Sequence, residues 1–548
     1  MPKHIIIGGA GVGKTYNLID RISREVNNGT PLNRIAFVTF SKAAAEEARE
    51  RLIATFNCEK RELDLCGTIH SICYKRFCKD KKVIKEKHKR DFFKLHHLDY
   101  EIRRTGEDLM ASDTNVSIPG NLILNFYDKI RMGKCKNITD IKSERELKDI
   151  FSDLNLSNFV YTDLFCNDFN MYTILKEYNK YLEDNDLIDF AEMLLTAYKG
   201  DYTIDADVLV LDEAQDLSPL QFFIFRQWSR DKKEIYISGD PNQTIYIFNL
   251  ANADYLINEI KNLDHKNGDE HIVLPKTYRM AEKINSYCSE YINKNMRKTK
   301  YVHSDIEPAR AGGEIIEEDV DGILERVTEW IDPNESTFIL TRTNYYKKRI
   351  IEDVLLEQGI PYLEIKGKSI WSIKATSIFN MVIKLVERKP ITGEEASLLF
   401  EAIPFKLGLM KRGSKAKFKK IEKKQEYKIT DLINAGFNLN FLNFLSYDKI
   451  YNILDISDPA KIAFENATKE PVGKINLRIG TCHSAKGKEC SVCIIFKDIS
   501  KKIANEVSKS QDAFESEIRV FYVGQSRAKN KLVILRGGFR HSERYIIP

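Results

Sequence analysis

A glycine-rich segment near the start of the sequence has the residue types and spacing of a phosphate-binding loop. Gly8-Gly9-Ala10-Gly11-Val12-Gly13-Lys14-Thr15 matches the pattern G-x-x-x-x-G-K-S/T. Small residues let successive backbone N–H groups turn inward around phosphates. Lys14 can supply a positive charge to the β- and γ-phosphates, and Thr15 a hydroxyl for Mg²⁺. The segment, extended by Tyr16, therefore predicts a site for a nucleoside triphosphate and Mg²⁺.

Two adjacent carboxylates follow an apolar segment later in the chain. Val208-Leu209-Val210-Leu211 precedes Asp212 and Glu213. Asp212 can hold Mg²⁺ directly or through water, and Glu213 can orient or deprotonate the attacking water. Alone, the pair is also consistent with two surface acids at the end of a strand. With the phosphate loop upstream, it predicts an Mg²⁺-dependent nucleoside triphosphatase.

The elements that would position these groups alternate between strand and helix. Residues 4–7 have the pattern of a strand, 16–26 that of a helix and 34–40 that of a second strand, which predicts a parallel sheet. Further strand-like segments occur at 208–213, 234–240, 336–342, 474–480, 491–496 and 531–535. Residues from about 80 to 200 are mostly helical by periodicity. The simplest architecture is two α/β cores, each interrupted by a mainly helical insertion.

The composition is that of a folded protein without a membrane span. Of 548 residues, 43% are hydrophobic, and 85 basic against 80 acidic side chains give a net charge of +5. No run of about 18 apolar residues occurs, and the amino-terminal segment reaches glycines too early for a secretory signal. We therefore expect a cytoplasmic protein whose ten cysteines are thiols. Their spacing favours packed thiols, and a metal site at Cys58, Cys66, Cys73 and Cys78 is the alternative.

Seven further motifs in a fixed order carry a family resemblance. They are VTFSKAA at 38–44, GTIHS at 67–71, DEAQD at 212–216, GDPNQTIY at 239–246, TYR at 277–279, TCHSAKGKE at 481–489 and YVGQSRA at 522–528. Together they resemble the superfamily 1 DNA helicases of the UvrD/PcrA/Rep type. The segments 186–190, 338–344 and 356–362 agree with this resemblance, which is thin over about 80–180 and 376–470.

The resemblance implies an α/β fold with two RecA-like P-loop NTPase core domains, each with a parallel sheet and a mainly helical insertion. The implied domains are a first core at 1–80 and 200–275, its helical insertion at 81–199, a second core at 276–375 and 471–548, and a reduced lysine-rich insertion at 376–470. Within the last, the run 411–424 has eight basic residues and one acid. It is either a solvated segment or a contact to the phosphate backbone of a nucleic acid.

The resemblance also assigns nucleotide contacts. Gln243 matches the residue that touches the γ-phosphate and links it to the DNA site. Tyr278 matches the aromatic residue that stacks on the base. Arg279 and Arg527 match two arginines that reach the γ-phosphate from the second core, in the manner of an arginine finger. Either arginine alone is also consistent with a surface ion pair.

Three other positions belong to the same implied nucleotide site. Gly487 and Glu489 match residues near the γ-phosphate and the sugar, and Arg342 is a further candidate for the nucleotide site or for the interface between domains. Lys488 stands where the family usually has an apolar residue. Relatives usually carry an adenine-reading Gln well before the glycine loop, where this sequence has only seven residues. We therefore expect relaxed base selectivity, and a strict preference for ATP over GTP and CTP would contradict this expectation.

The implied DNA contacts combine aromatic faces for bases with polar groups for phosphates. Phe40, Tyr246 and Phe248 match positions that stack on bases, and Phe248 stands where the family often has Trp. The positions that match residues lining the strand path are Thr39, Thr68, His70, Thr481 and His483. For Phe40 and Phe248, the alternative is packing in the hydrophobic core. For His70 and His483, the alternative is a structural role in the core or at the end of a strand.

These assignments lead to one functional hypothesis and two alternatives. The sequence is expected to encode a monomeric ATP- and Mg²⁺-dependent helicase that moves 3′ to 5′ on single-stranded DNA and unwinds duplex at junctions, with replication or repair proteins as partners. One alternative is a DNA-stimulated ATPase that remodels complexes without separating strands. The other is a P-loop kinase or regulatory NTPase without a nucleic-acid partner. No carboxylate cluster follows Arg540, so a fused nuclease is not expected.

Overall fold

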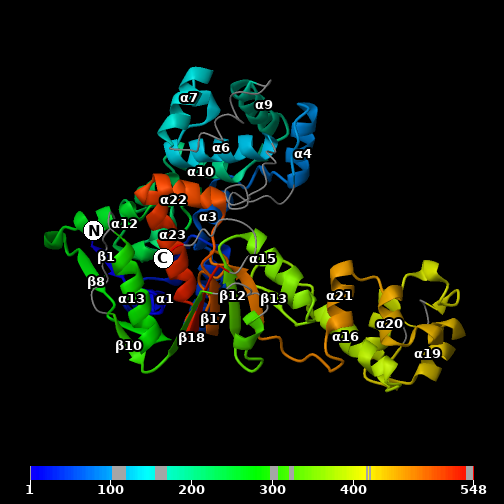
Figure 1. Cartoon of the computed structure of the whole chain (residues 1–548). Helices are drawn as coiled ribbons and strands as arrows, with labels where there is room; N and C mark the ends of the chain where they lie inside the picture. Colours follow the sequence, from blue (N-terminus) through cyan, green and yellow to red (C-terminus); the bar gives the residue numbers. More distant parts are fainter. Residues whose placement is uncertain are drawn as a thin grey trace. The chain divides into compact units, whose positions relative to one another are not determined.

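Two six-stranded sheets organise the chain (Figure 1). The computed structural model describes residues 2–101, 119–154, 170–296, 306–319, 326–414, 418, 421–537 and 547. The chain divides into a first compact unit (residues 1–314, 499–530 and 547) and a second (residues 315–498, 531–546 and 548). The predicted α/β class with parallel sheets is confirmed. No helix in the described part of the chain is long and apolar enough to cross a membrane.

The sheet of the first unit has the strand order β3-β2-β6-β7-β1-β8, and every neighbouring pair is parallel. Its strands are β1 (Lys3–Ile7), β2 (Ile35–Thr39), β3 (Cys66–Thr68), β6 (Val208–Asp212), β7 (Glu234–Gly239) and β8 (Glu270–Val273). In a parallel sheet all strands end at one edge. The loops after β1, β2, β6 and β7 therefore gather the predicted site residues at that edge.

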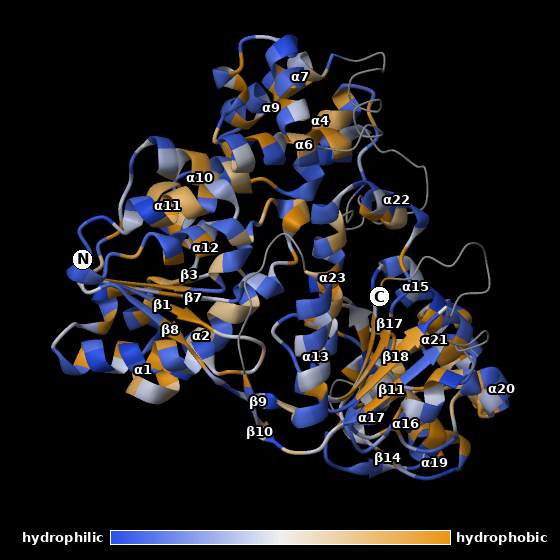
Figure 2. Cartoon of the chain, turned by 60° about the vertical axis from the view of Figure 1, so that its left-hand side comes forward, coloured by the Kyte–Doolittle hydropathy of each residue, from blue (hydrophilic) through white to orange (hydrophobic). Residues whose placement is uncertain are grey.

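Alternation along these strands explains the helical layers on both faces of the sheet. Ile6 packs with α1 (Lys14–Asn27) and α2 (Lys42–Phe56), whereas Ile5 and Ile7 pack with helices on the opposite face. Those helices include α3 (Ile69–Phe77), α10 (Phe190–Lys199), α11 (Pro219–Trp228) and α12 (Ala253–Lys261). Figure 2 shows the orange, apolar strands between the two layers.

Four helices in the described residues between β4 (Lys82–Val83) and β5 (Leu187–Ile188) enclose a core of their own. They are α4 (Glu86–Leu95), α6 (Pro119–Lys134), α7 (Glu144–Asp153) and α9 (Met171–Asp184). Arg131 of α6, which is fully buried, donates from both terminal nitrogens to the Asp189 carboxylate at 2.8 Å. The same carboxylate caps α10 by accepting the Glu192 N–H at 2.9 Å. One ion pair therefore fastens the helical group to the layer that covers the sheet.

We expect Arg131→Leu to lower the free energy of unfolding by about 3–5 kcal/mol, because it leaves Asp189 buried without its cationic partner. Urea denaturation followed by circular dichroism measures this loss. Arg24→Leu is the matched control, because Arg24 pairs with Asp20 at the surface, where side chains 69% and 46% exposed make the pair worth less than about 1 kcal/mol. Equal effects of the two substitutions would contradict the anchoring role of Arg131.

The remaining segments of the first unit follow β8 or come from near the end of the chain. They are β9 (Lys276–Ala281), α13 (Glu282–Asn295), β10 (Glu307–Arg310), α22 (Lys501–Lys509) and α23 (Gln511–Gln525). Arg279 and Arg527 therefore belong to the first compact unit. The proposed assignment of 276–314 and 499–530 to a second core domain stays a prediction.

The second unit is built on the strand order β11-β18-β17-β12-β16-β13. The strands are β11 (Glu314–Asp319), β12 (Thr337–Thr341), β13 (Leu363–Glu364), β16 (Leu477–Thr481), β17 (Cys490–Phe496) and β18 (Ala528–Arg536). β12 pairs in parallel with β16 and β17. After β12 comes α15 (Asn344–Ile350). The described helices between β13 and β16 are α16 (Ile373–Val386), α17 (Gly393–Ala402), α19 (Ile429–Ala435), α20 (Tyr447–Ile450) and α21 (Asp458–Asn466).

The lysine-rich run at 411–424 is anchored within this helical group. Phe418 is buried, and its ring stacks on Phe400 of α17 with centroids 3.9 Å apart. Lys411 donates from its side chain to the Ile433 carbonyl at 3.3 Å. Residues 415–417 and 419–420 lie outside the described residues. Contact of this run with a nucleic acid, the alternative to a solvated segment, stays a prediction.

The cysteines in the described residues are free thiols. Burial raises the pKa of Cys66 to about 11, and it raises the pKa of Cys73 further. Among the described residues, no group of three or more His, Cys, Asp or Glu side chains is arranged to hold a metal ion. Cys66 and Cys73 are therefore protonated, packed side chains.

Candidate functional site

The predicted phosphate loop joins β1 to α1, and its backbone geometry suits an anion. Gly11 and Gly13 have φ of +75° and +82°, which glycine adopts without strain. A Cβ at Gly11 would lie 2.4 Å from the Cβ of Arg279, so this position also needs glycine for close packing. Helix α1 begins without a side-chain cap and without acidic residues in its first turn. Its first N–H groups and the positive end of its dipole therefore suit a phosphate.

Lys14 and Thr15, which were predicted to contact phosphate and metal, make hydrogen bonds to the loop and to Asp212. Lys14 is 8% exposed, and its Nζ donates to the carbonyls of Gly8 at 2.9 Å and Gly9 at 3.2 Å. These bonds fold the ammonium back over the loop. Thr15 donates its hydroxyl to Asp212 Oδ2 at 2.7 Å. Oxygens from two separate elements thus meet at one point, as a hard cation such as Mg²⁺ requires.

Asp212 lies at the end of β6, between β2 and β7. Its Oδ1 accepts the Ser238 hydroxyl at 2.5 Å, while Oδ2 accepts Thr15. Burial and the adjacent Glu213 carboxyl raise the pKa of Asp212. A divalent cation beside this carboxylate would act in the opposite direction and favour its ionised form. The donor set therefore fits the predicted magnesium ion.

The β9 segment lies against the phosphate loop through backbone contacts. Thr277 donates its hydroxyl to the Ala10 carbonyl at 2.8 Å, and the Tyr278 N–H donates to the Gly11 carbonyl at 2.9 Å. These bonds leave the Tyr278 side chain 64% exposed beside the loop. Tyr16, in the first turn of α1, is 75% exposed. Two large aromatic faces are thus available near the phosphate loop, as stacking on a nucleotide base requires.

A chain of hydrogen bonds connects Arg279 and Arg527 with Gln243. Arg527 is 1% exposed, and its Nη2 approaches Gln243 Oε1 at 3.4 Å and Ser526 Oγ at 2.8 Å. Arg279 Nη1 approaches the Ser526 carbonyl at 3.4 Å. Gln243 in turn donates to Asp240 Oδ2 at 2.7 Å. The three side chains that the resemblance assigned to the γ-phosphate are therefore brought together in the first unit.

Three aromatic side chains, Phe40 after β2 and Tyr246 and Phe248 after β7, lie together and are here called the aromatic platform. The rings of Phe40 and Tyr246 stack with centroids 5.0 Å apart, and Phe248 meets Tyr246 edge to face at 5.9 Å. All three are partly exposed rather than buried. Tyr246 follows Gln243 by three residues, so the platform continues directly from the hydrogen-bonded chain. Its faces suit sequence-tolerant stacking of bases.

His70 and an unpredicted aromatic residue extend this edge. Phe190, at the start of α10, is 53% exposed and meets the His70 ring edge to face at 6.0 Å. Burial and the positive charge of Lys42 lower the pKa of His70 to about 4. The imidazole is therefore uncharged at neutral pH and can act as a hydrogen-bonding group. Thr39 is buried, and its hydroxyl has no hydrogen-bond partner among the described residues.

The same five-residue pattern ends a strand in each unit. Gly67-Thr68-Ile69-His70-Ser71 in the first unit matches Gly480-Thr481-Cys482-His483-Ser484 in the second. In both, the threonine hydroxyl accepts the serine N–H, and the serine hydroxyl donates to the threonine carbonyl at 2.8 Å. The glycine is needed because a Cβ there would lie about 2.5 Å from the serine oxygen (2.5 and 2.4 Å). This repeat of G-T-x-H-S was readable in the sequence and was missed.

The remaining predicted residues of the second unit differ in their exposure and in their contacts. Gly487 has φ of +80°, and Glu489 is exposed. Lys488 donates to the Ile365 carbonyl at 2.8 Å, which explains how a lysine fits where relatives have an apolar residue. Arg342 is buried directly after β12. Whether these residues contact a nucleotide stays a prediction.

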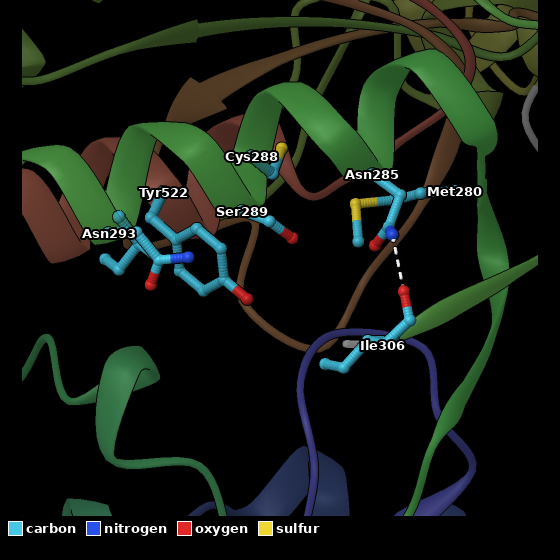
Figure 3. Close-up of a pocket in the computed structure, with 8 residues that line it drawn as sticks. Met280, Asn285, Cys288, Ser289, Asn293, Ile306 and Tyr522 are labelled. Atoms are coloured by element: carbon cyan, nitrogen blue, oxygen red, sulfur yellow. Dashed lines mark hydrogen bonds between the residues drawn. The ribbon is translucent and has the colours of Figure 1, made fainter. Parts of the chain in front are cut away.

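A small pocket lies between α13 and Tyr522 of α23 (Figure 3). Asn285 closes one side by donating to the Ile306 carbonyl at 2.8 Å. Burial raises the pKa of the Tyr522 hydroxyl well above its ordinary value, and a hydrogen bond with the Ala10 backbone acts against this shift. Tyr522 thus links α23 to the phosphate loop. None of the predicted nucleotide-binding residues lines the pocket, so it is separate from the phosphate site.

The sequence matches two family models in succession. Residues 2–264 match the UvrD/REP helicase N-terminal domain. Residues 375–536 match the UvrD-like helicase C-terminal domain. The matched regions include the phosphate loop, Asp212 and Glu213, Gln243, and the segment that carries Arg527.

Individual relatives agree with these matches at low identity. The Bacillus subtilis protein YjcD, named as an ATP-dependent DNA helicase, is 22% identical over 99% of this chain and 79% of its own length. DNA helicase II of Escherichia coli is 25% identical over 66% of this chain and 49% of its own. PcrA of Staphylococcus epidermidis is 22% identical over 68% of this chain and 50% of its own. The chain thus spans about half to four fifths of the length of these relatives.

Proposed function

Because the chain belongs to the UvrD-like family of ATP-dependent DNA helicases, we propose that it hydrolyses ATP to move 3′ to 5′ along single-stranded DNA and to unwind duplex DNA at junctions. The unwinding activity and its polarity rest on the resemblance to the UvrD/PcrA/Rep type. We further propose that it acts as a monomer in the cytoplasm, with proteins of replication or repair as partners.

One observation carries this proposal: the phosphate site and the aromatic platform share a single stretch of chain. Gln243 contacts Asp240 and approaches Arg527 on the nucleotide side, and Tyr246 stacks on Phe40 three residues later. A group that senses the γ-phosphate can therefore shift the aromatic residues that hold DNA. Nucleotide-dependent switching between two grips on DNA is what a translocating enzyme needs.

The residues divide the chemistry among them. The phosphate loop and Lys14 would bind the phosphates, and Thr15 and Asp212 would hold Mg²⁺, which when bound neutralises charge on the β- and γ-phosphates. Glu213 would accept a proton from the attacking water. Arg279 and Arg527 would stabilise the charge that develops on the transferred phosphoryl group. Tyr278 would stack on the base, and this type of contact favours tolerance among nucleotides.

The deciding experiment combines DNA-stimulated ATPase with unwinding of duplexes that carry a 3′ or a 5′ single-stranded tail. We expect stimulation by single-stranded DNA and unwinding from the 3′ tail alone. Tyr246→Ala should weaken single-strand binding by about 1–3 kcal/mol, because base stacking contributes that much per base. Tyr74→Phe is the control, because Tyr74 lies on α3 and its hydroxyl bonds only to the Lys81 carbonyl among the partners described.

Each outcome separates the candidate functions. Unwinding only from a 5′ tail would overturn the proposed polarity. DNA-stimulated hydrolysis without any unwinding would support a single-strand translocase or remodelling factor instead. Hydrolysis that does not respond to DNA would favour a P-loop enzyme without a nucleic-acid partner.

A further inference from the structure

We propose that Gln215 is a positioning residue that holds Glu213 in the orientation for accepting a proton and ties it to the segment that senses DNA. This inference rests on the proposed role of Glu213 in ATP hydrolysis. It concerns a fully buried side chain to which the sequence assigned no role.

The backbone at Glu213 is in an uncommon conformation. Its φ of 57° and ψ of 43° lie in the left-handed region, which costs a residue with a side chain about 1 kcal/mol or more. The turn follows the buried strand β6 and leads into a short helical turn at Ala214–Asp216. Glu213 is partly exposed, whereas Asp212, a proposed metal ligand, is buried. A side chain on such a turn needs an external partner to fix its orientation.

Gln215 supplies that partner, and its amide can point only one way. Its Oε1 accepts the backbone N–H of Asp240 at 3.0 Å, and its Nε2 donates to Glu213 Oε2 at 2.5 Å. Because a backbone N–H can only donate, the oxygen of the amide must face Asp240. The NH₂ group must then face Glu213. The bond fixes which carboxylate oxygen accepts from Gln215 and restrains the rotation of the carboxylate.

Close packing keeps this bridge short. A Cβ at Gly239 would lie 2.6 Å from Gln215 Oε1 and 2.5 Å from Leu256 Cδ2. The absence of a side chain at Gly239 therefore lets the amide reach the end of β7. The bridge spans β6 and β7, which are neighbours in the sheet.

The bridge also connects hydrolysis with the DNA-sensing stretch. Asp240 holds Gln215 through its backbone N–H and holds Gln243 through its carboxylate at 2.7 Å. Residues 239–243 thus lie between Glu213 on one side and the aromatic platform on the other. A shift of this stretch on DNA binding would move Gln215, and with it the carboxylate of Glu213. This connection offers a physical route for stimulation of hydrolysis by DNA.

Gln215→Leu in the full chain tests the role of the bridge. We expect the DNA-stimulated kcat to fall about 10–100-fold, because small displacements of a catalytic group cost rates of this order. The KM for ATP should stay within about twofold, since Lys14 and the loop are untouched. Gln221→Leu is the matched control: Gln221 is 3% exposed and accepts the Ser218 N–H at 2.9 Å to cap α11. It should lower stability without lowering kcat.

Gln215→Glu adds a second test, the pH dependence of kcat, which a purely structural role of Gln215 would not change. The introduced carboxyl can still accept the Asp240 N–H, but it can donate to Glu213 only when protonated. The ratio of variant to wild-type kcat should therefore rise as the pH falls. A ratio that is flat with pH, or a kcat of Gln215→Leu within twofold of wild type, would overturn the positioning role. Equal losses in Gln215→Leu and Gln221→Leu would also overturn it.

Two measurements on the wild type and on Lys14→Ala distinguish the role of Gln215 from the function of the whole protein. If the wild-type protein shows no DNA-stimulated hydrolysis, or if Lys14→Ala remains active, the proposed function fails. If both behave as expected and the Gln215 variants do not, only the positioning role fails.

Discussion

Lys14→Ala is expected to lower DNA-stimulated ATP hydrolysis by about 10²–10³-fold and to make duplex unwinding undetectable. Lys14 is nearly buried and is the charged side chain that the phosphate loop itself contributes. Removing one preorganised donor to developing charge in a water-excluded site costs rates of this order. In the structure the ammonium is bonded to the carbonyls of Gly8 and Gly9, which place it over the loop. The measurement is steady-state ATPase with and without single-stranded DNA, together with strand displacement.

Lys199→Ala is the control for loss of a lysine. Lys199 ends α10 and pairs with Asp140, and the two side chains are 42% and 37% exposed, so its charge lies at the surface. We expect wild-type activity from this variant. Unchanged unwinding by Lys14→Ala would refute the assignment of the phosphate site.

The class of fold and the position of the glycine-rich loop were predictable because their signals are local. The phosphate loop is recognised from consecutive residues: glycines, a lysine and a threonine. Its glycines at positions 11 and 13 adopt the positive φ that such a turn needs. The strands could be recognised because buried parallel strands are continuously apolar, as in Val208–Asp212. Asp212 was predictable because it directly ends such a strand. Its bond to Thr15, 197 positions away, confirms that the two segments meet.

Other features depend on contacts that no local pattern encodes. Gln215 reaches Asp240 across 25 positions because β6 and β7 are neighbours in the sheet. Arg131 pairs with Asp189 across 58 positions. In sequence each is an ordinary polar residue, and only tertiary packing brings it to partners on other elements. Phe190 was missed for a related reason: its exposure beside His70 depends on how α10 covers the sheet.

Glu213 and Asp212 are adjacent carboxylates for which the structure gives different environments. Asp212 is 4% exposed and accepts hydroxyls from Thr15 and Ser238. Glu213 is partly exposed, lies on a left-handed backbone turn, and accepts the Gln215 amide N–H. A carboxylate surrounded by fixed hydroxyls suits a cation, whereas one at the edge of the site can meet water. Substitution of each by its amide should therefore have distinct consequences.

Glu213→Gln is expected to lower kcat for ATP hydrolysis by about 10²–10⁴-fold, because an amide cannot accept the proton of the attacking water. Nucleotide affinity should remain within about threefold of wild type, since the phosphate loop, Lys14 and the proposed metal ligands are unchanged. Single-turnover hydrolysis and titration with a fluorescent ATP analogue measure the two quantities separately.

Asp212→Asn should instead weaken nucleotide binding in a way that depends on Mg²⁺ concentration. Glu282→Gln, at an exposed position in the first turn of α13, should change neither quantity. If Glu213→Gln lost affinity rather than kcat, Glu213 would act in binding the nucleotide, and the proton would have to go to another group.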